Sequence, residues 1–261
     1  MKTNQFNATV PIRFEQLGRR KGGGRIALLD ELRGLAIVNM VAYHLCYDLV
    51  DIFGFDWPWF FSKGAGIWQE YIALSFLSIA GICTRFSGRA YVRTLKIALC
   101  AALITLATYF IYPDQTIVFG ILHCMAAAML VYALFQRQLE NTPPFVGLAV
   151  SLLLMLLTWN VANGWLGIGG LRLPLPDILY RAGFLFPLGF SGPDFRSADY
   201  FPLFPYLFVF LAGGFAGEWI KNIPAHMRRE HIVFLAFIGR YSLLVYMLHQ
   251  PVLFGVLSLL L

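Results

Sequence analysis

Apolar stretches of about the length that crosses a lipid bilayer recur along this chain of 261 residues, and they constrain its fold more than any other feature. A helix needs roughly 20 apolar residues to span the hydrocarbon core. Lipid offers no hydrogen-bond partners to the backbone, so only helices and closed barrels can cross it. Seven stretches approach this length, at 30–50, 66–86, 93–112, 116–136, 143–163, 203–220 and 239–260. They predict an all-α, polytopic membrane bundle of about seven transmembrane helices.

The composition excludes the main alternatives to a membrane protein. Hydrophobic residues make up 59% of the chain and charged residues only 13%, against about 25% charged residues in typical soluble domains. A water-soluble enzyme, a disulfide-rich secreted domain and a disordered chain are thereby ruled out. The cysteines lie inside apolar stretches without C-x-x-C spacing, so we expect them to pack in the core: Cys46, Cys83, Cys100 and Cys124.

The charges also predict how the chain is oriented in the membrane. Residues 1–25 are polar and basic and contain no apolar core followed by a cleavage site, so we expect a cytoplasmic segment rather than a removable signal peptide. With the N-terminus inside, 14 of the 20 Lys and Arg residues fall on the inner side and four on the outer side. The positive-inside rule therefore predicts a cytoplasmic N-terminus and an outer C-terminus. The chain divides into this segment and a transmembrane domain over 26–261.

The connection at 164–202 has a different pattern from the spans. It is rich in Gly and Pro, which break up its short apolar pieces. Such a pattern fits a partly re-entrant or interfacial segment better than a spanning helix. Whether it is re-entrant or contains an additional span stays open at this point.

Ionisable groups inside the first span mark a candidate site. Charged side chains in a bilayer cost about 2.5–3.5 kcal/mol each on insertion scales, so each one suggests a function. Arg33 and His44 are eleven residues apart, close to three helical turns, and so project from one face about 16 Å apart. His44 and Asp48 form an i, i+4 pair suited to a general base or nucleophile. The alternatives are an interfacial ion pair between Asp30 and Arg33, and a hydrogen-bonded core histidine.

Two further histidines lie within spans. His123 stands at a depth comparable with His44, and His249 lies near the middle of the last span, nine residues after Arg240. For both, a polar contact between helices is an equal alternative. The histidines are scattered without metal-ligand spacing, so we expect no metal site.

A basic cluster follows the second span on the inner side: Arg85, Arg89, Arg93 and Lys96. It can serve as a topology signal that contacts anionic lipid headgroups. The alternative is a docking site for a phosphorylated ligand, because guanidinium groups match the geometry of phosphate.

At these residues the chain resembles the catalytic-domain family of heparan-alpha-glucosaminide N-acetyltransferase, particularly its short bacterial members. The resemblance is carried by RIALLDELRGLAIVNMVAYHLCYDL, FLSIAGICTRFSGR, LKIALCAALITLATYFIYP with FGILHC, and DYFPLFPYLFVFLAG. The spacing of Arg33 and His44, with the ending GRYSLLVYMLHQPV, is also similar to membrane acyltransferase family three. The resemblance implies transfer of an acyl group, typically acetyl from cytoplasmic acetyl-CoA, to an amine or hydroxyl on the far side.

The resemblance also implies roles for individual residues. In family three, the first-span arginine and histidine of this spacing are the functional pair, which corresponds to Arg33 and His44. The lysosomal relative looks to use a histidine in the lumenal loop after its first span. Residues 51–65 of this chain contain no histidine, so His44 is the expected substitute.

Together these considerations predict three groups of site residues. We expect His44, Asp48 and His123 in catalysis, Arg33, Arg85, Arg89, Arg93 and Arg240 in donor binding, and Asp199, Tyr200 and His249 in acceptor binding.

The expected partners are acetyl-CoA as acyl donor, an amino-sugar or glycan acceptor and the lipid bilayer of a bacterial plasma membrane, with no nucleic acid. A homodimer stays open. One alternative function is a small transporter or flippase, in which buried charges line a solute or proton pathway. A non-catalytic assembly or sensor protein is a third option.

Overall fold

The computed structural model describes residues 26–86 and 88–261. The expected basic segment 1–25 lies outside the described residues. The longer helices are α1 (Ala27–Tyr47), α2 (Lys63–Thr84), α3 (Ala90–Ile111), α4 (Ile121–Leu134), α6 (Pro144–Thr158), α8 (Leu203–Ile220) and α10 (Ser242–Leu260). Shorter elements are α5 (Gln136–Asn141), α7 (Asp177–Arg181), α9 (Val233–Arg240) and the antiparallel strands β1 (Trp165–Ile168) and β2 (Leu171–Pro174).

The helices confirm the predicted polytopic membrane bundle. Six helical segments are long and apolar enough to cross a membrane, and α4 is a shorter apolar helix. The span expected at 203–220 coincides with α8. The span expected at 116–136 begins as a helix only at Ile121, because Phe119 pairs with Tyr200 in an extended bridge before it.

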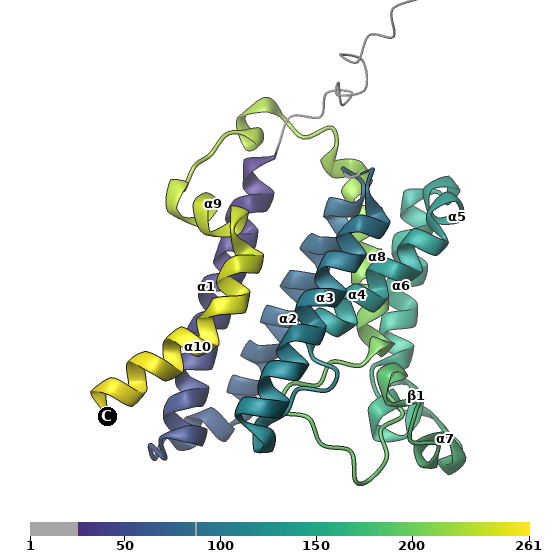
Figure 1. The fold of residues 1–261 in the computed structure, drawn as a ribbon. Helices are drawn as coiled ribbons and strands as arrows, with labels where there is room; N and C mark the ends of the chain where they lie inside the picture. The colour runs from purple at the N-terminus through teal and green to yellow at the C-terminus, as the bar shows by residue number, and fades with distance from the viewer. Residues whose placement is uncertain (1–25, 87) are drawn as a thin grey trace, which may run out of the picture.

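The bundle has two parts (Figure 1). Helices α2, α3, α4, α6 and α8 pack together, while α1 and α10 lie at their edge, where α10 crosses α1. The short helix α9 folds back onto the first turns of α1, and this helix was not expected from the sequence. Its position brings the start of α10 next to Arg33, so α9 helps to set the geometry of the site.

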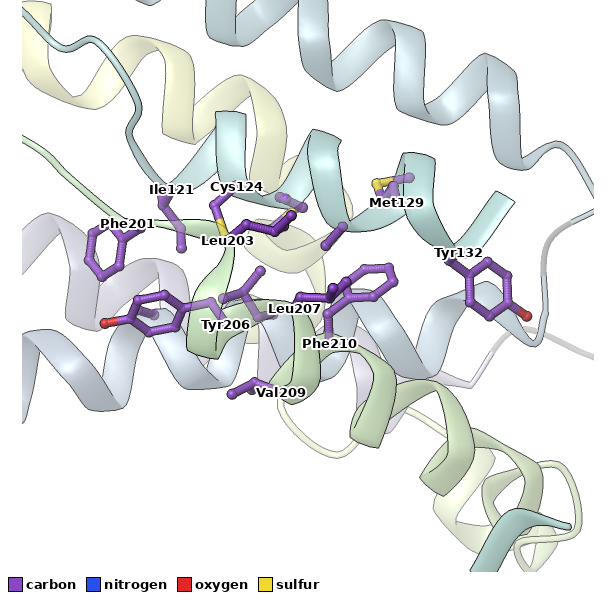
Figure 2. Close-up of a cluster of buried hydrophobic side chains, with 14 residues drawn as sticks. Ile121, Cys124, Met129, Tyr132, Phe201, Leu203, Tyr206, Leu207, Val209 and Phe210 are labelled. Atoms are coloured by element: carbon purple, nitrogen blue, oxygen red, sulfur yellow. The ribbon is translucent and has the colours of Figure 1, made fainter. Parts of the chain in front are cut away.

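A hydrophobic cluster joins α2, α4 and α8 at the centre of the larger part (Figure 2). Leu77, Cys124 and Phe210 are fully buried in it. Tyr206 and Tyr132 lie toward opposite ends of the cluster. Helix α8 is the most enclosed of the spanning helices, with 61% of its apolar window buried. The cluster therefore fixes α2 and α4, which form two walls of the site.

The connection at 164–202 forms the β1–β2 hairpin, the short helix α7 and irregular turns at one end of the bundle (Figure 1). Its longest helix among the described residues has five residues, so it contains no additional span. The backbone N–H groups of Ala198 and Phe201 donate to the carbonyls of Thr116 and Phe119. These hydrogen bonds hold the end of the connection against the start of α4.

Glycines allow the closest helix contacts. A Cβ atom added at Gly81 would collide with the carbonyl oxygen of Phe210 and would lie 2.9 Å from the Gly214 nitrogen. Gly66, in the same helix, has no heavy atom within 4 Å of such a Cβ. Small residues let helix backbones approach where lipid supplies no hydrophobic driving force.

We therefore predict that Gly81→Ala lowers the free energy of unfolding by about 1–3 kcal/mol, the usual cost of overpacking. Gly66→Ala is the matched control in the same helix, and it should be neutral or slightly stabilising because alanine favours helix. Thermal unfolding of the purified protein in detergent measures both. Equal melting temperatures for the two variants would contradict the close packing of α2 against α8.

Candidate functional site

A pocket of about 290 Å³ lies between α1, α2, α3, α4 and α10. Three cationic side chains line it: Arg33 from α1, and Arg93 and Lys96 from α3. The rest of its wall is largely apolar, from Phe76, Ala80, Cys83, Ile97, Ile121, Leu122, Met125, Met129, Ser242, Leu243 and Tyr246. A cavity of this kind suits an anionic group attached to an apolar or neutral chain.

Arg33 is held by three neighbours. Its Nη1 atom donates to Asp30 Oδ1 at 3.0 Å and to the carbonyl of Gly239 at 3.2 Å, and Nη2 lies 3.0 Å from Cys83 Sγ. The ion pair with Asp30 is the interfacial alternative considered above. The guanidinium nevertheless lines the pocket, so this pairing leaves it available to a ligand.

Arg93 approaches the same point from α3. Its Nη1 donates to the Cys83 carbonyl at 3.3 Å. Cys83 therefore contacts both guanidinium groups, one through its sulfur and one through its backbone. Two cations that face one pocket repel each other, and an anionic ligand between them relieves that repulsion.

His44 and His249 lie together on the other side of Tyr246. Their ring centroids are 4.7 Å apart with the rings nearly perpendicular. Nδ1 of His44 lies 2.9 Å from the Met40 carbonyl, and Nδ1 of His249 lies 2.6 Å from the Tyr246 carbonyl. A carbonyl only accepts, so both rings carry their proton on Nδ1 when neutral and keep Nε2 as a free base.

Asp48 lies at the start of a π-helical turn, Asp48–Ile52, that continues α1. It is fully buried, and its Oδ1 accepts a hydrogen bond from Nε2 of Gln250 rather than from His44. Three enclosed polar atoms of this cluster have no partner in the described residues: Asp48 Oδ2, Gln250 Oε1 and His249 Nε2. All three are acceptors, so the cluster lacks donors.

Tyr246 links the pocket to the histidines. It lines the pocket, and its ring centroid lies 5.5 Å from that of His249. On its other side it meets Phe76 edge to face at 6.5 Å. The cationic pocket and the histidine pair are therefore neighbours separated by one aromatic ring.

Three of the arginines expected in donor binding lie outside the pocket. Arg85 donates to the Gly214 carbonyl at 2.8 Å and lies over the Phe215 ring. Arg240 pairs with Glu230. Arg89 is exposed immediately before α3, one turn from Arg93.

The contacts of His123 do not place it beside His44 and His249. Its Nε2 lies 3.1 Å from the Thr105 hydroxyl, which donates to the Ile117 carbonyl at 2.7 Å. The hydroxyl proton is therefore used in that hydrogen bond, so Nε2 of His123 donates to the Thr105 hydroxyl oxygen. This arrangement is a polar contact between α3 and α4.

Asp199 and Tyr200 lie at the end of the connection before α8, where Tyr200 forms an isolated bridge with Phe119. Asp199 Oδ2 accepts the Ile121 N–H at 3.0 Å, so it caps the N-terminus of α4 from outside the helix. Burial raises the pKa of the Asp199 carboxyl, and this hydrogen bond opposes the rise. The Tyr200 hydroxyl donates to the Phe186 carbonyl at 2.6 Å, and burial raises its pKa to about 12.

Several residues of interest were missed from the sequence. Gln250 carries no charge and gave no signal, although it directly follows His249 in the last span. Lys96 lines the pocket, although nothing in the spacing of the basic cluster distinguishes it from its neighbours. Glu70 lies inside α2, where a carboxylate is itself a signal, and its Oε1 accepts from the Tyr206 hydroxyl at 2.7 Å while Oε2 is enclosed and unpartnered. Among the described residues, no group of three His, Cys, Asp or Glu side chains could hold a metal ion.

The fold and the site define a multi-pass membrane protein with an internal cationic pocket next to a pair of histidines. The family model described as heparan-alpha-glucosaminide N-acetyltransferase, catalytic, matches residues 25–251. The chain therefore belongs to this family of membrane N-acetyltransferases, as its sequence motifs indicated. No curated protein and no solved structure matches it.

The capping hydrogen bond of Asp199 gives a prediction about stability. Asp199→Ala removes the acceptor for the Ile121 N–H and should lower the free energy of unfolding by about 1 kcal/mol. Asp199→Asn keeps an acceptor oxygen and should retain most of the stability. Thermal unfolding in detergent compares them, with Asp194→Ala in the exposed part of the same connection as control. If Asp199→Ala melts like the control, the capping role is wrong.

Proposed function

We propose that this protein is an integral membrane acetyltransferase that moves an acetyl group from cytoplasmic acetyl-CoA to an amine or hydroxyl of a sugar-like acceptor on the outer side. The observation that carries the proposal is the pocket with three cations, which ends at Tyr246 against the histidine pair. Membership of the N-acetyltransferase family supports the reaction type. The bacterial plasma membrane is the proposed location.

Acetyl-CoA combines several phosphate charges with a long, thin, neutral arm. Arg33, Arg93 and Lys96 supply positive charge in the pocket, and the apolar residues between them suit the arm. Arg89 is exposed just before α3, four residues before Arg93, and can extend the basic surface toward the cytoplasm. Arg85 and Arg240 are left out of this assignment because protein partners already hold them.

His44 is the proposed general base. Its Nδ1 lies against the Met40 carbonyl, so Nε2 is the atom that would accept the proton. His123 is left with a role in joining α3 and α4, because its hydrogen bond goes to Thr105.

The unpartnered hydrogen-bond acceptors support an acyl-accepting substrate that is rich in N–H or O–H groups. Asp48 Oδ2, Gln250 Oε1 and His249 Nε2 each need an N–H or O–H partner. An amine or a hydroxyl of a sugar supplies such donors. In the proposed reaction its nitrogen or oxygen attacks the acetyl carbon, the C–S bond breaks, and the proton passes through His44 to the departing CoA sulfur.

Donor binding gives the first functional prediction. Arg93→Gln and Lys96→Gln each remove a charged hydrogen-bond donor, an interaction worth about 1.5–3 kcal/mol. Each should weaken the binding of acetyl-CoA to the purified protein in detergent by about 10-fold or more. Calorimetry or thermal stabilisation by acetyl-CoA measures this effect. Arg137→Gln, exposed on the same side, is the control and should bind like the wild-type protein.

If the wild-type protein gains no thermal stability from either acetyl-CoA or CoA, the enzyme assignment is overturned. The transporter alternative, which requires no CoA ester, would then be favoured.

The base gives the second functional prediction. His44→Ala should reduce acetyl transfer from labelled acetyl-CoA to a panel of amino sugars by at least about 100-fold, the lower range for general-base catalysis. Its expression and its binding of acetyl-CoA should stay near those of the wild-type protein. His231→Ala, an exposed histidine, is the matched control. Retained transfer by His44→Ala would show that another group acts as the base.

A further inference from the structure

We propose that the hydroxyl of Tyr246 donates a hydrogen bond to the carbonyl oxygen of the acyl thioester and stabilises the negative charge that this oxygen gains during transfer. The inference rests on the proposed function and assigns a catalytic donor to it. Neither the sequence motifs nor the family match singled out this residue.

The position of Tyr246 is the first argument. It lines the same pocket as Arg33, Arg93 and Lys96, and its ring lies against His249. The reacting carbonyl carbon has to meet both the donor arm, which comes from the pocket, and the attacking group, which lies beside the histidines. Tyr246 borders both regions, so a thioester at the end of the pocket nearest the histidines would lie next to it.

The hydrogen-bonding state of Tyr246 is the second argument. Among the described residues, its hydroxyl has no hydrogen-bond partner. The hydroxyl oxygen is also not one of the fully enclosed polar atoms that lack a partner. The hydroxyl is therefore accessible, and it belongs to a residue that lines the pocket. A tyrosine hydroxyl inside a protein normally has a partner, because leaving it unpaired costs free energy. A ligand atom that accepts a hydrogen bond would complete this site.

The rigidity of the surroundings is the third argument. The Tyr246 backbone carbonyl accepts from Nδ1 of His249, while Phe76 packs against the edge of the Tyr246 ring. A donor that is fixed before the reaction needs no reorganisation when charge develops. The same residue thus orients His249 through its backbone and would serve the oxyanion through its side chain.

The chemistry balances with the groups already named. The amine or hydroxyl of the acceptor forms a bond to the acetyl carbon, and the C=O electron pair moves to the oxygen that Tyr246 faces. The pair then returns as the C–S bond breaks, and the CoA thiolate receives the proton that His44 took from the acceptor. Tyr246 keeps its own proton throughout, so phenylalanine removes only the donor.

Tyr246→Phe is the test, with the amino sugar of the panel that the wild-type protein acetylates fastest. We expect kcat to fall by about 100-fold, the usual loss on removing one oxyanion donor. The Kd for acetyl-CoA and the KM for the amino sugar should change by less than about threefold, because the ring and its packing remain. Incorporation of 3-fluorotyrosine at position 246 restores a hydroxyl and should restore most of the activity.

Tyr43→Phe is the matched control, because Tyr43 contacts the His44 ring from α1 but does not line the pocket. It should retain activity within about threefold. Near-normal kcat for Tyr246→Phe in an active wild-type background would overturn the inference and leave the proposed function intact. Absence of transfer by the wild-type protein itself would instead overturn the proposed function.

Discussion

The guanidinium group of Arg33 is the interaction on which the geometry of the site depends. Hydrocarbon does not solvate a charge, so protein atoms must satisfy it. Here the group bonds to Asp30 in its own helix, to the Gly239 carbonyl at the end of α9 and to Cys83 in α2. It thereby fixes α1 against the larger part of the bundle and holds the junction from which α10 starts. Three turns further along α1, the ring of His44 meets that of His249 where α10 crosses α1.

Two glycines allow α9 and α1 to pack closely enough for the Gly239 carbonyl to reach Arg33. A Cβ atom at Gly34 would collide with the backbone of Leu235, and one at Gly239 would collide with the backbone of Asp30. The two glycines therefore let α9 lie directly on α1. Without this approach the Gly239 carbonyl would not reach Arg33, and the charge would lose one of its acceptors. Small residues and a partly buried cation thus act together where α9 packs on α1.

The spans could be predicted because hydropathy reflects a constraint that each segment meets by itself. Features that depend on contacts between segments could not. Helix α9 is too short to be recognised as a span, and its fold onto α1 depends on Gly34 and Gly239. Arg85 and Arg93 belong to one basic cluster, yet only Arg93 lies on the face of α3 that lines the pocket, while Arg85 turns to the Gly214 carbonyl. Sequence spacing does not distinguish these outcomes.

The hydrogen-bond partner of Asp48 could not be predicted from the sequence either. The i, i+4 rule places Asp48 beside His44 on an ideal α-helix. The π-helical turn that starts at Asp48 changes the local helix geometry, and Gln250 of α10 supplies the hydrogen bond. Such turns occur often at functional sites, but they leave no mark in the hydropathy pattern. The eleven-residue spacing of Arg33 and His44 is a sounder guide, since both lie within the regular part of α1.

Helix α10 both packs against α1 and carries residues of the proposed site. Its apolar side chains are little enclosed, with Leu257 its one buried residue in the described chain. Val245 and Tyr246 of α10 pack against Ile37 and Met40 of α1, and Gln250 adds a hydrogen bond to Asp48. The ring of His249 meets that of His44 edge to face. Substitution of Asp48 or Gln250 would disturb helix packing as well as any reaction. His44, His249 and Tyr246 keep free groups that packing does not use, namely Nε2 of each imidazole and the phenolic hydroxyl, so changes to these atoms report on chemistry more directly.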